Sequence, residues 1–350
     1  MTATTFPYHN LITNTPNFAN QTPTTPAPNY DDVPLLLSFI YGSIATMSIG
    51  GNGIIILVIL YDRSIIANPT NMLIFTLAIV DSLTGIVMFF TPSLIIGIRY
   101  YSFPTGIPGG AIFCHLVDSF FIFFSLGNLS VMLVMLISIE RWAAVVRATK
   151  YSKWFALRRV KICIGIVIIL VIILNLDNLL GKIYVPGVFP PCVWSPIFPK
   201  PSQNLTLFTV FEITRLFLPV LLIILCYVNI AKKTLFSHKV GGLTQEQSAK
   251  YIARRRVTTM CFVSSAALVV CWLPNEIYFV MMNFEIIDYS FVVHGVTKTL
   301  VIFNSCINPF IYAATNRAYR RSIFQFITRK HNYYKARTHR LTSIANTSNH

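Results

Sequence analysis

Acidic residues are scarce in this chain: its 350 residues contain 12 Asp and Glu against 28 Lys and Arg, and only 11% of all residues are charged. Ordinary soluble domains carry roughly 25% charged residues, so this shortage argues against a soluble globular protein. Hydrophobic residues make up 54% instead. The net charge of +16 does not indicate nucleic-acid binding, because the basic residues lie between apolar segments rather than on one soluble face. The composition predicts a polytopic membrane protein.

Residue groups that would support catalysis or transport are also missing from the sequence. His115 and His294 are isolated, His238 lies in a predicted loop, and no nucleophile with a nearby base can be identified. Internal repeats, matched broken helices and rings of pore charges, which are typical of transporters and channels, are not found either. We therefore predict neither an enzyme nor a transporter, and no cofactor.

Seven apolar stretches are each long enough to cross a bilayer as a helix, which requires about 20 mostly apolar residues. They cover approximately residues 33–61, 71–98, 111–145, 157–180, 205–231, 252–283 and 290–314. The predicted fold is therefore an all-α membrane protein, with a seven-transmembrane helix bundle over residues 33–314. Because seven is odd, the two ends of the chain are expected on opposite sides of the membrane.

The distribution of basic residues predicts which side is which. The first 35 residues contain no Lys or Arg, whereas basic residues concentrate after the first, third and fifth spans and in the C-terminal tail. The loop after the third span holds Arg147, Lys150, Lys153, Arg158, Arg159 and Lys161. By the positive-inside rule these loops are cytoplasmic. We therefore expect a plasma-membrane protein with its N-terminus outside and its tail inside.

Both ends of the chain are polar. Residues 1–32 are rich in Thr, Pro and Asn and are predicted to be a disordered outer tail, and residues 329–350 a disordered cytoplasmic tail. Asn20, and Asn204 before the fifth span, each begin an N-glycosylation sequon on the outer side. Residues 315–328 alternate basic and apolar side chains, which predicts a short amphipathic helix held at the bilayer surface by anionic lipid.

Two of the seven cysteines lie outside the apolar interior of the predicted spans. Cys114 opens the third span and Cys192 lies in the loop between the fourth and fifth spans, both in the oxidising outer compartment. A disulfide between them would hold this loop over the bundle, and the alternative is two free thiols. The other five cysteines are interpreted as small buried hydrophobes.

Several spans carry groups that lipid penalises. Asp81 lies in the middle of the second span, with Ser130, Asn304 and Asn308 at comparable depth in the third and seventh spans. These four residues are candidate ligands of a small cation with water, whereas the alternative is a neutral, hydrogen-bonded aspartate in the core. Pro219, Pro274 and Pro309 interrupt the last three spans, with Trp272 just before Pro274. Such breaks predict hinges that let the cytoplasmic halves move.

Short motifs recur in order along these spans. They are Gly51-Asn52, "LAIVD" (77–81), Glu140-Arg141-Trp142, Pro219 with Tyr227, "CWLP" (271–274) and "NPFIY" (308–312). Over about residues 33–328 this set resembles the signature of rhodopsin-like (class A) G-protein-coupled receptors, and the chain is most similar in type to neuropeptide receptors. The resemblance implies coupling to heterotrimeric G proteins, arrestin as a further partner, and an allosteric sodium ion at Asp81, Ser130, Asn304 and Asn308.

The resemblance also assigns an activation switch. Glu140 would restrain Arg141 at rest, and Arg141 would face the G protein once the sixth span swings outward. The other residues of this switch would be Tyr227, Trp272, Pro274, Asn308, Pro309 and Tyr312. Two of the departures from the family pattern lead to predictions. Arg254 stands where many members have an acid that pairs with this arginine, which predicts raised basal activity. Cys114 precedes Arg141 by two residues more than usual, which predicts an extension or bulge in the third span.

The ligand is only partly constrained. Phe123 replaces the aspartate of monoamine receptors and Ile302 replaces the retinal lysine of opsins, so both ligand classes are disfavoured. The outer halves of the spans mix charged, polar and aromatic groups, which suits a peptide; a small non-peptide ligand, lipid or other non-amine, is the alternative. The candidate ligand-binding residues are Phe123, Arg215, Asn275, Glu276, Phe279 and Lys298. Glu276 would receive a cationic group and Arg215 or Lys298 an acceptor, unless these charges pair with one another.

Overall fold

The structure is a computed structural model that describes residues 35–61, 66–92, 94–97, 100–236, 245–317, 319–321, 323, 324 and 328. The expectations for residues 1–32, including Asn20, and for residues 329–350 lie outside the described residues, and the predicted amphipathic helix is only partly described. The elements follow in the order α1 (Leu35–Tyr61), α2 (Pro69–Phe90), α3 (Gly109–Phe113), α4 (Phe121–Val146), α5 (Ala148–Trp154), α6 (Leu157–Leu174), α7 (Leu176–Leu180), β1 (Lys182–Tyr184), β2 (Cys192–Trp194), α8 (Pro201–Glu212), α9 (Leu218–Phe236), α10 (Gln245–Asn283) and α11 (Phe291–Thr315).

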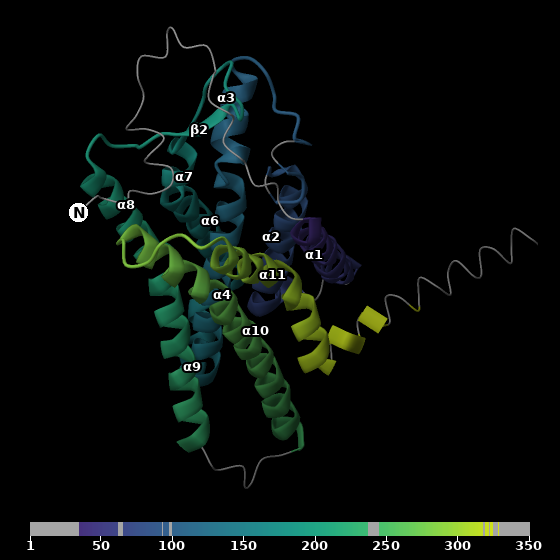
Figure 1. The fold of residues 1–350 in the computed structure, drawn as a ribbon. Helices are drawn as coiled ribbons and strands as arrows, with labels where there is room; N and C mark the ends of the chain where they lie inside the picture. The colour runs from purple at the N-terminus through teal and green to yellow at the C-terminus, as the bar shows by residue number, and fades with distance from the viewer. Residues whose placement is uncertain are drawn as a thin grey trace, which may run out of the picture.

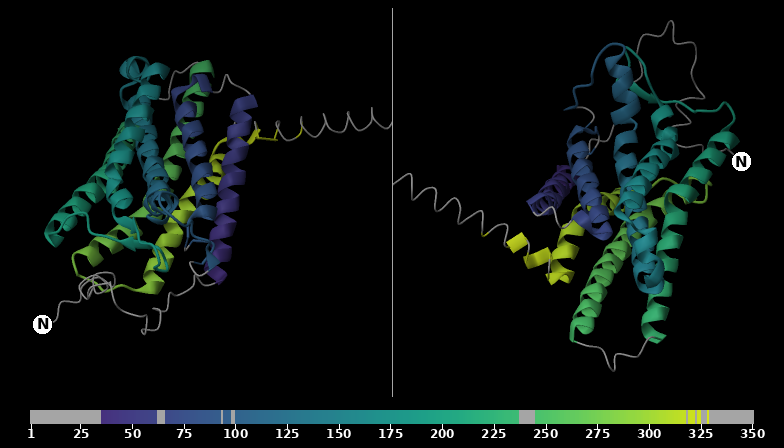
Figure 2. Two further views of the ribbon diagram at one scale, coloured as in Figure 1. Left: turned by 90° about the horizontal axis from the view of Figure 1, so that it is seen from above. Right: turned by 180° about the vertical axis from the view of Figure 1, so that it is seen from behind.

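The long helices form one bundle with α4 at its centre (Figure 1). α4 packs against α2, α6, α9 and α10, while α1 packs against both α2 and α11. Because α1 contacts α11, the first and last long helices are neighbours. α11 also packs against α10, and these contacts close the bundle (Figure 2). The seven predicted spans are therefore present, some of them built from two consecutive helical segments.

Apolar side chains lie both inside and outside the bundle. Leu77, Leu133 and Leu268 are among those buried in its main core, whereas Ile166 and Ile169 of α6 are well exposed. Within the part of the chain that the structure describes, six helical segments are long and apolar enough to cross a membrane. α11 has 25 residues but carries Lys298, Asn304 and Asn308, which make it less apolar than the others. An apolar outer surface around a partly polar interior is the arrangement expected in lipid.

The second span ends eight residues earlier than predicted from its hydropathy. α2 begins after Asn68, whose side chain accepts a hydrogen bond from the Thr70 amide (3.0 Å), with Pro69 in the first turn. It ends at Phe90, because Pro92 disfavours helical backbone at Thr91, which is extended with φ −91° and ψ 119°. The prediction that the helix continues to Ile98 was therefore wrong, and the turn signal of Pro92 overrides the apolar residues that follow.

The third span is interrupted near its start. Cys114–Asp118 form a π-helical turn, and Phe120 has a left-handed φ of 61° before α4 begins. The hydroxyl of Ser119 donates to the His115 carbonyl (2.5 Å) and accepts from the Phe121 amide (3.1 Å), which starts the new helix. A π turn holds an additional residue compared with an α-helical turn. The predicted bulge is thus confirmed, and it lies at these two irregularities.

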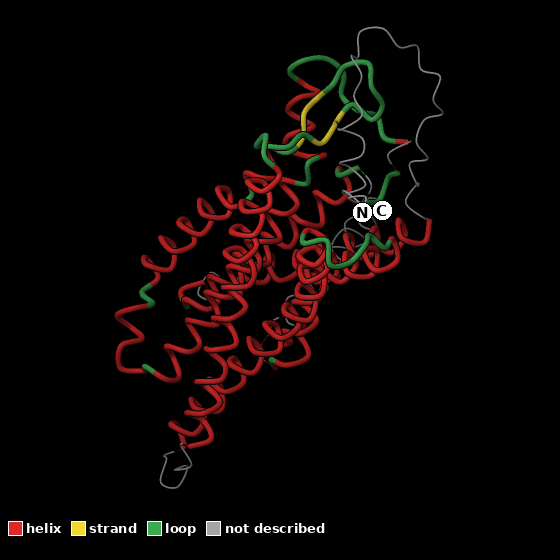
Figure 3. Tube along the Cα trace, turned by 60° about the vertical axis from the view of Figure 1, so that its left-hand side comes forward, coloured by secondary structure: helices red, strands yellow, loops and turns green. Residues whose placement is uncertain are grey.

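A short antiparallel hairpin covers one end of the bundle (Figure 3). In this hairpin Lys182 pairs with Trp194 and Tyr184 with Cys192. The predicted disulfide joins Cys192 to Cys114 at the start of the π turn, with a Cα–Cα distance of 5.2 Å. We call this end of the bundle the hairpin end and the opposite end, where α4 finishes, the Arg141 end.

Candidate functional site

Glu140 and Arg141 form a buried ion pair at the end of α4. The Arg141 Nε donates to Glu140 Oε2 at 2.5 Å, and its Nη2 contacts both Glu140 Oε1 and the Thr70 hydroxyl. Glu140 is fully buried and Arg141 is 5% exposed. An ionised pair in such a place depends on good geometry and further hydrogen bonds, since removal of one partner leaves an uncompensated charge. The guanidinium is thus held against its own helix in this conformation.

Tyr151 of α5 completes the shell around this carboxylate. Its hydroxyl donates to Glu140 Oε1 at 2.5 Å, and Thr70 of α2 donates to the same oxygen at 3.1 Å. Burial, and then the neighbouring Glu140 charge, raise the pKa of Tyr151 to about 12, so the phenol stays protonated and remains a donor at physiological pH. Sequence analysis did not identify Thr70 or Tyr151, because neither stands near Glu140 in the chain.

The sixth span brings a second positive charge, that of Arg254, to the end of α4 where Arg141 lies. Arg254 of α10 donates through Nη1 to the carbonyl of Ala144 (3.4 Å), one turn after Arg141 on α4. The residue that replaces the usual acid therefore lies against the same helix end as Arg141. Its presence there explains why restraint of Arg141 depends on Glu140, Thr70 and Tyr151 in place of an interhelical ion pair.

Asp81 is fully buried between α2, α4 and α11. Its carboxylate accepts hydrogen bonds from Ser130 (3.2 Å) and from the amide nitrogen of Asn308 (2.8 Å), while Ser264 of α10 donates to Asn308 Oδ1 at 2.6 Å. Asn304 is also buried, one turn before Asn308 on α11. The structure therefore gathers Asp81, Ser130 and Asn308 directly and places Asn304 on the adjoining turn.

A second set of bonds ties α1 to this region. The Ser48 hydroxyl contacts the carbonyls of Asp81 (2.8 Å) and Ser305 (3.0 Å), and Asn52 Nδ2 donates to Ser305 O at 2.9 Å. These bonds satisfy a carbonyl of α11 near the break at Pro309. The Gly51-Asn52 motif has a local reason as well, because a Cβ atom at Gly51 would stand only 3.1 Å from Pro309 Cγ.

The remaining switch residues lie along α9, α10 and α11. Pro274 and Pro309 are inside their helices, and the ring of Trp272 packs against Gly127 of α4, where a Cβ atom would be 2.7 Å from Cη2. The Trp272 Nε1 is buried without a hydrogen-bond partner among the described residues. The indole therefore occupies a space that exists only because position 127 has no side chain.

The two tyrosines of the predicted switch are also buried, near the Arg141 end. Ser265 of α10 donates to the Tyr227 hydroxyl (3.3 Å), and the rings of Tyr312 and Tyr319 pack 5.8 Å apart. Tyr319 in turn donates to Asn71 Oδ1 at 3.0 Å. These contacts link α9 to α10, and the end of α11 to α2.

The predicted ligand residues lie between the centre of the bundle and the hairpin end. Phe123 is buried and its ring packs against Phe120 and Phe124. The Lys298 ammonium lies over the Phe120 ring, 5.3 Å from its centroid, whereas the Phe279 ring contacts the His294 imidazole edge to face at 5.5 Å. Asn275 Nδ2 contacts Glu276 Oε1 at 3.3 Å.

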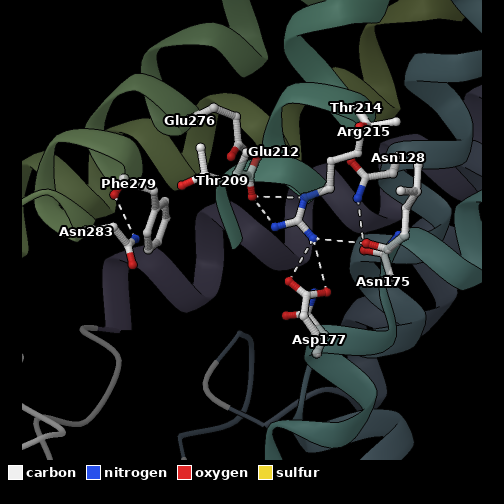
Figure 4. A network of polar contacts seen from close by, with 12 residues as sticks. Asn128, Asn175, Asp177, Thr209, Glu212, Thr214, Arg215, Glu276, Phe279 and Asn283 are labelled. Atoms are coloured by element: carbon white, nitrogen blue, oxygen red, sulfur yellow. Dashed lines mark hydrogen bonds and ion pairs between the residues drawn. The ribbon is translucent and has the colours of Figure 1, made fainter. Parts of the chain in front are cut away.

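Arg215 already has acidic partners, as Figure 4 shows. Its Nε donates to Glu212 Oε1 at 2.9 Å, its Nη2 pairs with the same oxygen, and its Nη1 lies 3.2 Å from Asp177 Oδ2. The alternative that the outer charges pair with one another therefore holds for Arg215. Sequence analysis missed Asp177 and did not join it to Arg215, because their helices meet only in the folded bundle.

The hairpin end carries another ion pair that was not predicted. Lys182 of β1 binds Asp118 of the π turn at 2.5 Å, and its ammonium lies 4.9 Å from the centroid of the Trp194 ring. Asn204, the second candidate for glycosylation, lies on α8, and its Nδ2 donates to the Phe198 carbonyl at 2.8 Å.

Comparison with known proteins decides the family. The profile of the 7 transmembrane receptor (rhodopsin family) matches residues 51–312, which include Arg141, the buried Asp81 and the helix-interrupting Pro274 and Pro309. This chain belongs to the rhodopsin family of receptors. The receptor is accordingly a multi-pass membrane protein and not an enzyme, as the sequence predicted.

Several receptors are similar to this one along most of the chain. Somatostatin receptor type 1 of Rattus norvegicus is 29% identical over 299 residues, which cover 82% of this receptor and 70% of that protein. Somatostatin receptor type 2 of Mus musculus is 28% identical, covering 87% and 80%. Tachykinin-like peptides receptor 99D of Drosophila melanogaster is 26% identical, covering 82% of this receptor and 56% of its own length.

Proposed function

We propose that this receptor binds an extracellular peptide at the hairpin end and transmits binding to heterotrimeric G proteins at the Arg141 end. The observation that carries the proposal is the buried Glu140–Arg141 pair, in a chain of the rhodopsin family whose relatives are named for somatostatin and tachykinin-like peptides. The opposite ends of one bundle would then hold the ligand and the G protein.

The proposed mechanism is a shift between two arrangements of Arg141. At rest Glu140, Thr70 and Tyr151 hold the guanidinium and its partner carboxylate. An outward swing of the inner half of α10 about Pro274 would expose Arg141 to a G protein. A ligand that binds the open arrangement more tightly raises its population, and the G protein raises ligand affinity by the same factor.

The mixed charge near the hairpin end supports a peptide ligand. Phe123, Asn275, Glu276, Phe279 and Lys298 remain our proposed ligand contacts, with Glu276 as the acidic and Lys298 as the basic one. Arg215 is proposed to act on the ligand indirectly, since Glu212 and Asp177 already engage its guanidinium. A small non-peptide ligand would not need opposite charges on α10 and α11.

The topology and remaining partners belong to the same proposal. The hairpin end would face outward at the plasma membrane with Asn20 and Asn204 glycosylated, and arrestin would compete at the Arg141 end. The Asp81 region would hold sodium, because its carboxylate and the Ser130 hydroxyl are the oxygen ligands that hard cations prefer. Asn304 would add its amide oxygen, whereas Asn308 donates its amide nitrogen to Asp81 and its Oδ1 accepts from Ser264, so the Asn308 oxygen would reach the ion only after the amide turns over. The Asp81 carboxylate and the Ser130 hydroxyl are thus the groups that support the ion.

The test is a neuropeptide library applied to cells that express the receptor with a promiscuous reporter G protein. An active peptide is expected to accelerate nucleotide exchange on the G protein, and Arg141→Ala is expected to abolish this response. Peptide binding to the Arg141→Ala variant at normal surface expression serves as the control. Undiminished nucleotide exchange in this variant would reject the mechanism, and a response confined to lipid ligands would reject the peptide.

A further inference from the structure

Three carboxyl groups gather around one guanidinium where α7, α8 and α10 meet (Figure 4). Arg215 is bonded to Glu212 and Asp177, and Glu276 lies beside Glu212 within electrostatic reach of Arg215. The side chains of Glu212 and Asp177 are 4% and 16% exposed, and residue Glu276 is 7% exposed. We call these four residues the carboxyl cluster. Three carboxyl groups thus share one cationic group in this cluster.

Two buried oxygens in and beside the carboxyl cluster accept no hydrogen bond from an N–H group, and the Glu212 carboxyl lies within hydrogen-bond reach of the Glu276 carboxyl. Arg215 binds Glu212 through Oε1 alone, and Glu212 Oε2 is buried without a hydrogen bond among the described residues. Asn275 Oδ1 is equally buried and unpaired, although Asn275 Nδ2 contacts Glu276. A buried acceptor without a donor costs free energy, and such groups are few in native structures. These oxygens therefore indicate where a donor from outside the chain binds.

The donor that fits best is a positively charged group with several N–H bonds. A neutral hydroxyl would satisfy one oxygen but would leave the excess negative charge unpaired. A guanidinium offers five donors in a plane and an ammonium offers three. In a peptide, Arg and Lys side chains carry these groups.

Partly buried side chains of α8 and α10 flank the cluster. Thr209 precedes Glu212 by one turn of α8, while Phe279 and Asn283 follow Glu276 by one and two turns of α10. These three side chains are only partly buried and lie beside the cluster in Figure 4. A long basic side chain that passes them would reach Glu276 and Glu212 with its head group.

We propose that Glu212 and Glu276 form a subsite for an arginine or lysine side chain of the peptide ligand, an inference that rests on the proposed function. Glu276 and Glu212 Oε2 contact the ligand cation, and Asn275 Oδ1 accepts a further hydrogen bond. Arg215 is a positioning residue, because its two bonds to Oε1 fix Glu212 and leave Oε2 free. Asp177 offsets the Arg215 charge, so that Arg215 does not repel the ligand cation.

The experiment compares Nα-acetyl-arginine amide with Nα-acetyl-citrulline amide, which has nearly the same shape but no charge, as probes of purified full-length receptor; they are called arginine amide and citrulline amide here. Millimolar arginine amide is expected to raise the Tm of the wild-type receptor by about 1–2 °C, and citrulline amide to leave the Tm unchanged. Glu276→Gln should abolish the Tm shift, because it removes the carboxylate that contacts the ligand cation. The variant should still fold, because Arg215 keeps its bonds to Glu212 and Asp177. Glu285→Gln, which removes an exposed carboxylate near the same end of α10, should retain the Tm shift.

The outcomes separate this subsite from the function. Equal shifts with both amides, no shift in the wild type, or a full shift in Glu276→Gln would overturn the subsite, even if a peptide activates the receptor. Glu212→Gln is the second variant, and its surface expression shows whether loss of the Arg215 pair prevents folding. If arginine amide binds as expected but no peptide activates the receptor, the subsite stands and the peptide function fails.

Discussion

Glu140 is fully buried, and both of its carboxylate oxygens accept hydrogen bonds from Arg141. These two bonds restrain the guanidinium. Glu140→Gln keeps the shape of the side chain but removes the charge and turns one acceptor into a donor that faces the guanidinium. Loss of a hydrogen bond between charged groups costs about 1.5 kcal/mol, which corresponds to roughly tenfold in an equilibrium. We expect agonist-independent GTP turnover in membranes with added G protein to rise by roughly five- to tenfold.

Tyr151→Phe is the matched control for this effect. It removes a donor to the same carboxylate but leaves both bonds between Glu140 and Arg141 in place. Its basal turnover should therefore rise by less than that of Glu140→Gln. Basal turnover equal to wild type in Glu140→Gln, at equal surface expression, would contradict the role of this pair in the resting state.

Gly127 is required by the indole of Trp272. In Gly127→Ala the new methyl group would lie 2.7 Å from Trp272 Cη2, so the ring or α4 must move. Overpacking of this kind costs about 1–3 kcal/mol, which exceeds the gain of about 1 kcal/mol that Ala brings to a helix interior. The Tm of the purified receptor should fall by a few degrees.

Gly165→Ala on α6 provides the comparison, because a Cβ atom there meets nothing within 4 Å. This variant gains helix propensity without a clash, so its Tm should equal or exceed that of the wild type. If the two variants have the same Tm, the contact between Gly127 and Trp272 does not constrain the indole.

Helix existence was easier to predict than helix ends. Hydropathy located all seven spans, because each must hold about 20 apolar residues, but it extended α2 through Pro92 into an apolar loop. The irregular start of the third span was predicted from the spacing between Cys114 and Arg141. Its form, a π turn followed by left-handed Phe120, depends on the hydrogen bonds of Ser119 and is not encoded in the spacing.

The hairpin is attached to the third span by an ion pair as well as by the disulfide. Lys182 and Asp118 are both largely buried, and each balances the charge of the other. Asp118→Asn leaves the Lys182 ammonium without its carboxylate, which costs about 3–5 kcal/mol for a buried pair. The Tm of this variant should fall strongly, measured on purified receptor under non-reducing conditions.

Lys182→Met combined with Asp118→Leu tests whether the charge itself is responsible. Removal of both partners leaves no buried charge, so the double variant should be more stable than Asp118→Asn alone. A double variant that is less stable than Asp118→Asn would show that packing, rather than charge pairing, dominates at this position.

The whole bundle brings together residues that the sequence keeps far apart. Asp81 and Asn308 are 227 positions apart, yet the family motifs predicted that they belong to one site. The carboxyl cluster follows no such motif. Its four residues come from α7, α8, a second π-helical turn that follows α8 (Ile213–Phe217) and α10, and their pairing depends on how these helices rotate against one another. The sequence therefore offered Glu212, Arg215 and Glu276 as charged groups of the outer halves, but it identified neither Asp177 nor the pairing that neutralises Arg215.

Signalling requires α10 to separate from α4 at the Arg141 end, and Arg254 is positioned to influence that step. Because Arg254 contacts α4 at Ala144, Arg254→Glu would replace a repulsive charge by an attractive one close to Arg141. A favourable ion pair across this interface is worth about 1 kcal/mol, or roughly a fivefold shift toward the resting arrangement. We expect basal GTP turnover to fall by about this factor and agonist potency to decrease.

Arg256→Glu makes the same change of charge at an exposed position two residues along α10. It controls for the general effect of charge on the recruitment of G protein, so only Arg254→Glu should lower basal turnover selectively. The expected decrease also depends on Arg141, because the introduced carboxylate acts through the guanidinium. Basal turnover that falls as much in Arg256→Glu as in Arg254→Glu would show that the charge affects the G protein directly and not the packing of α10 against α4.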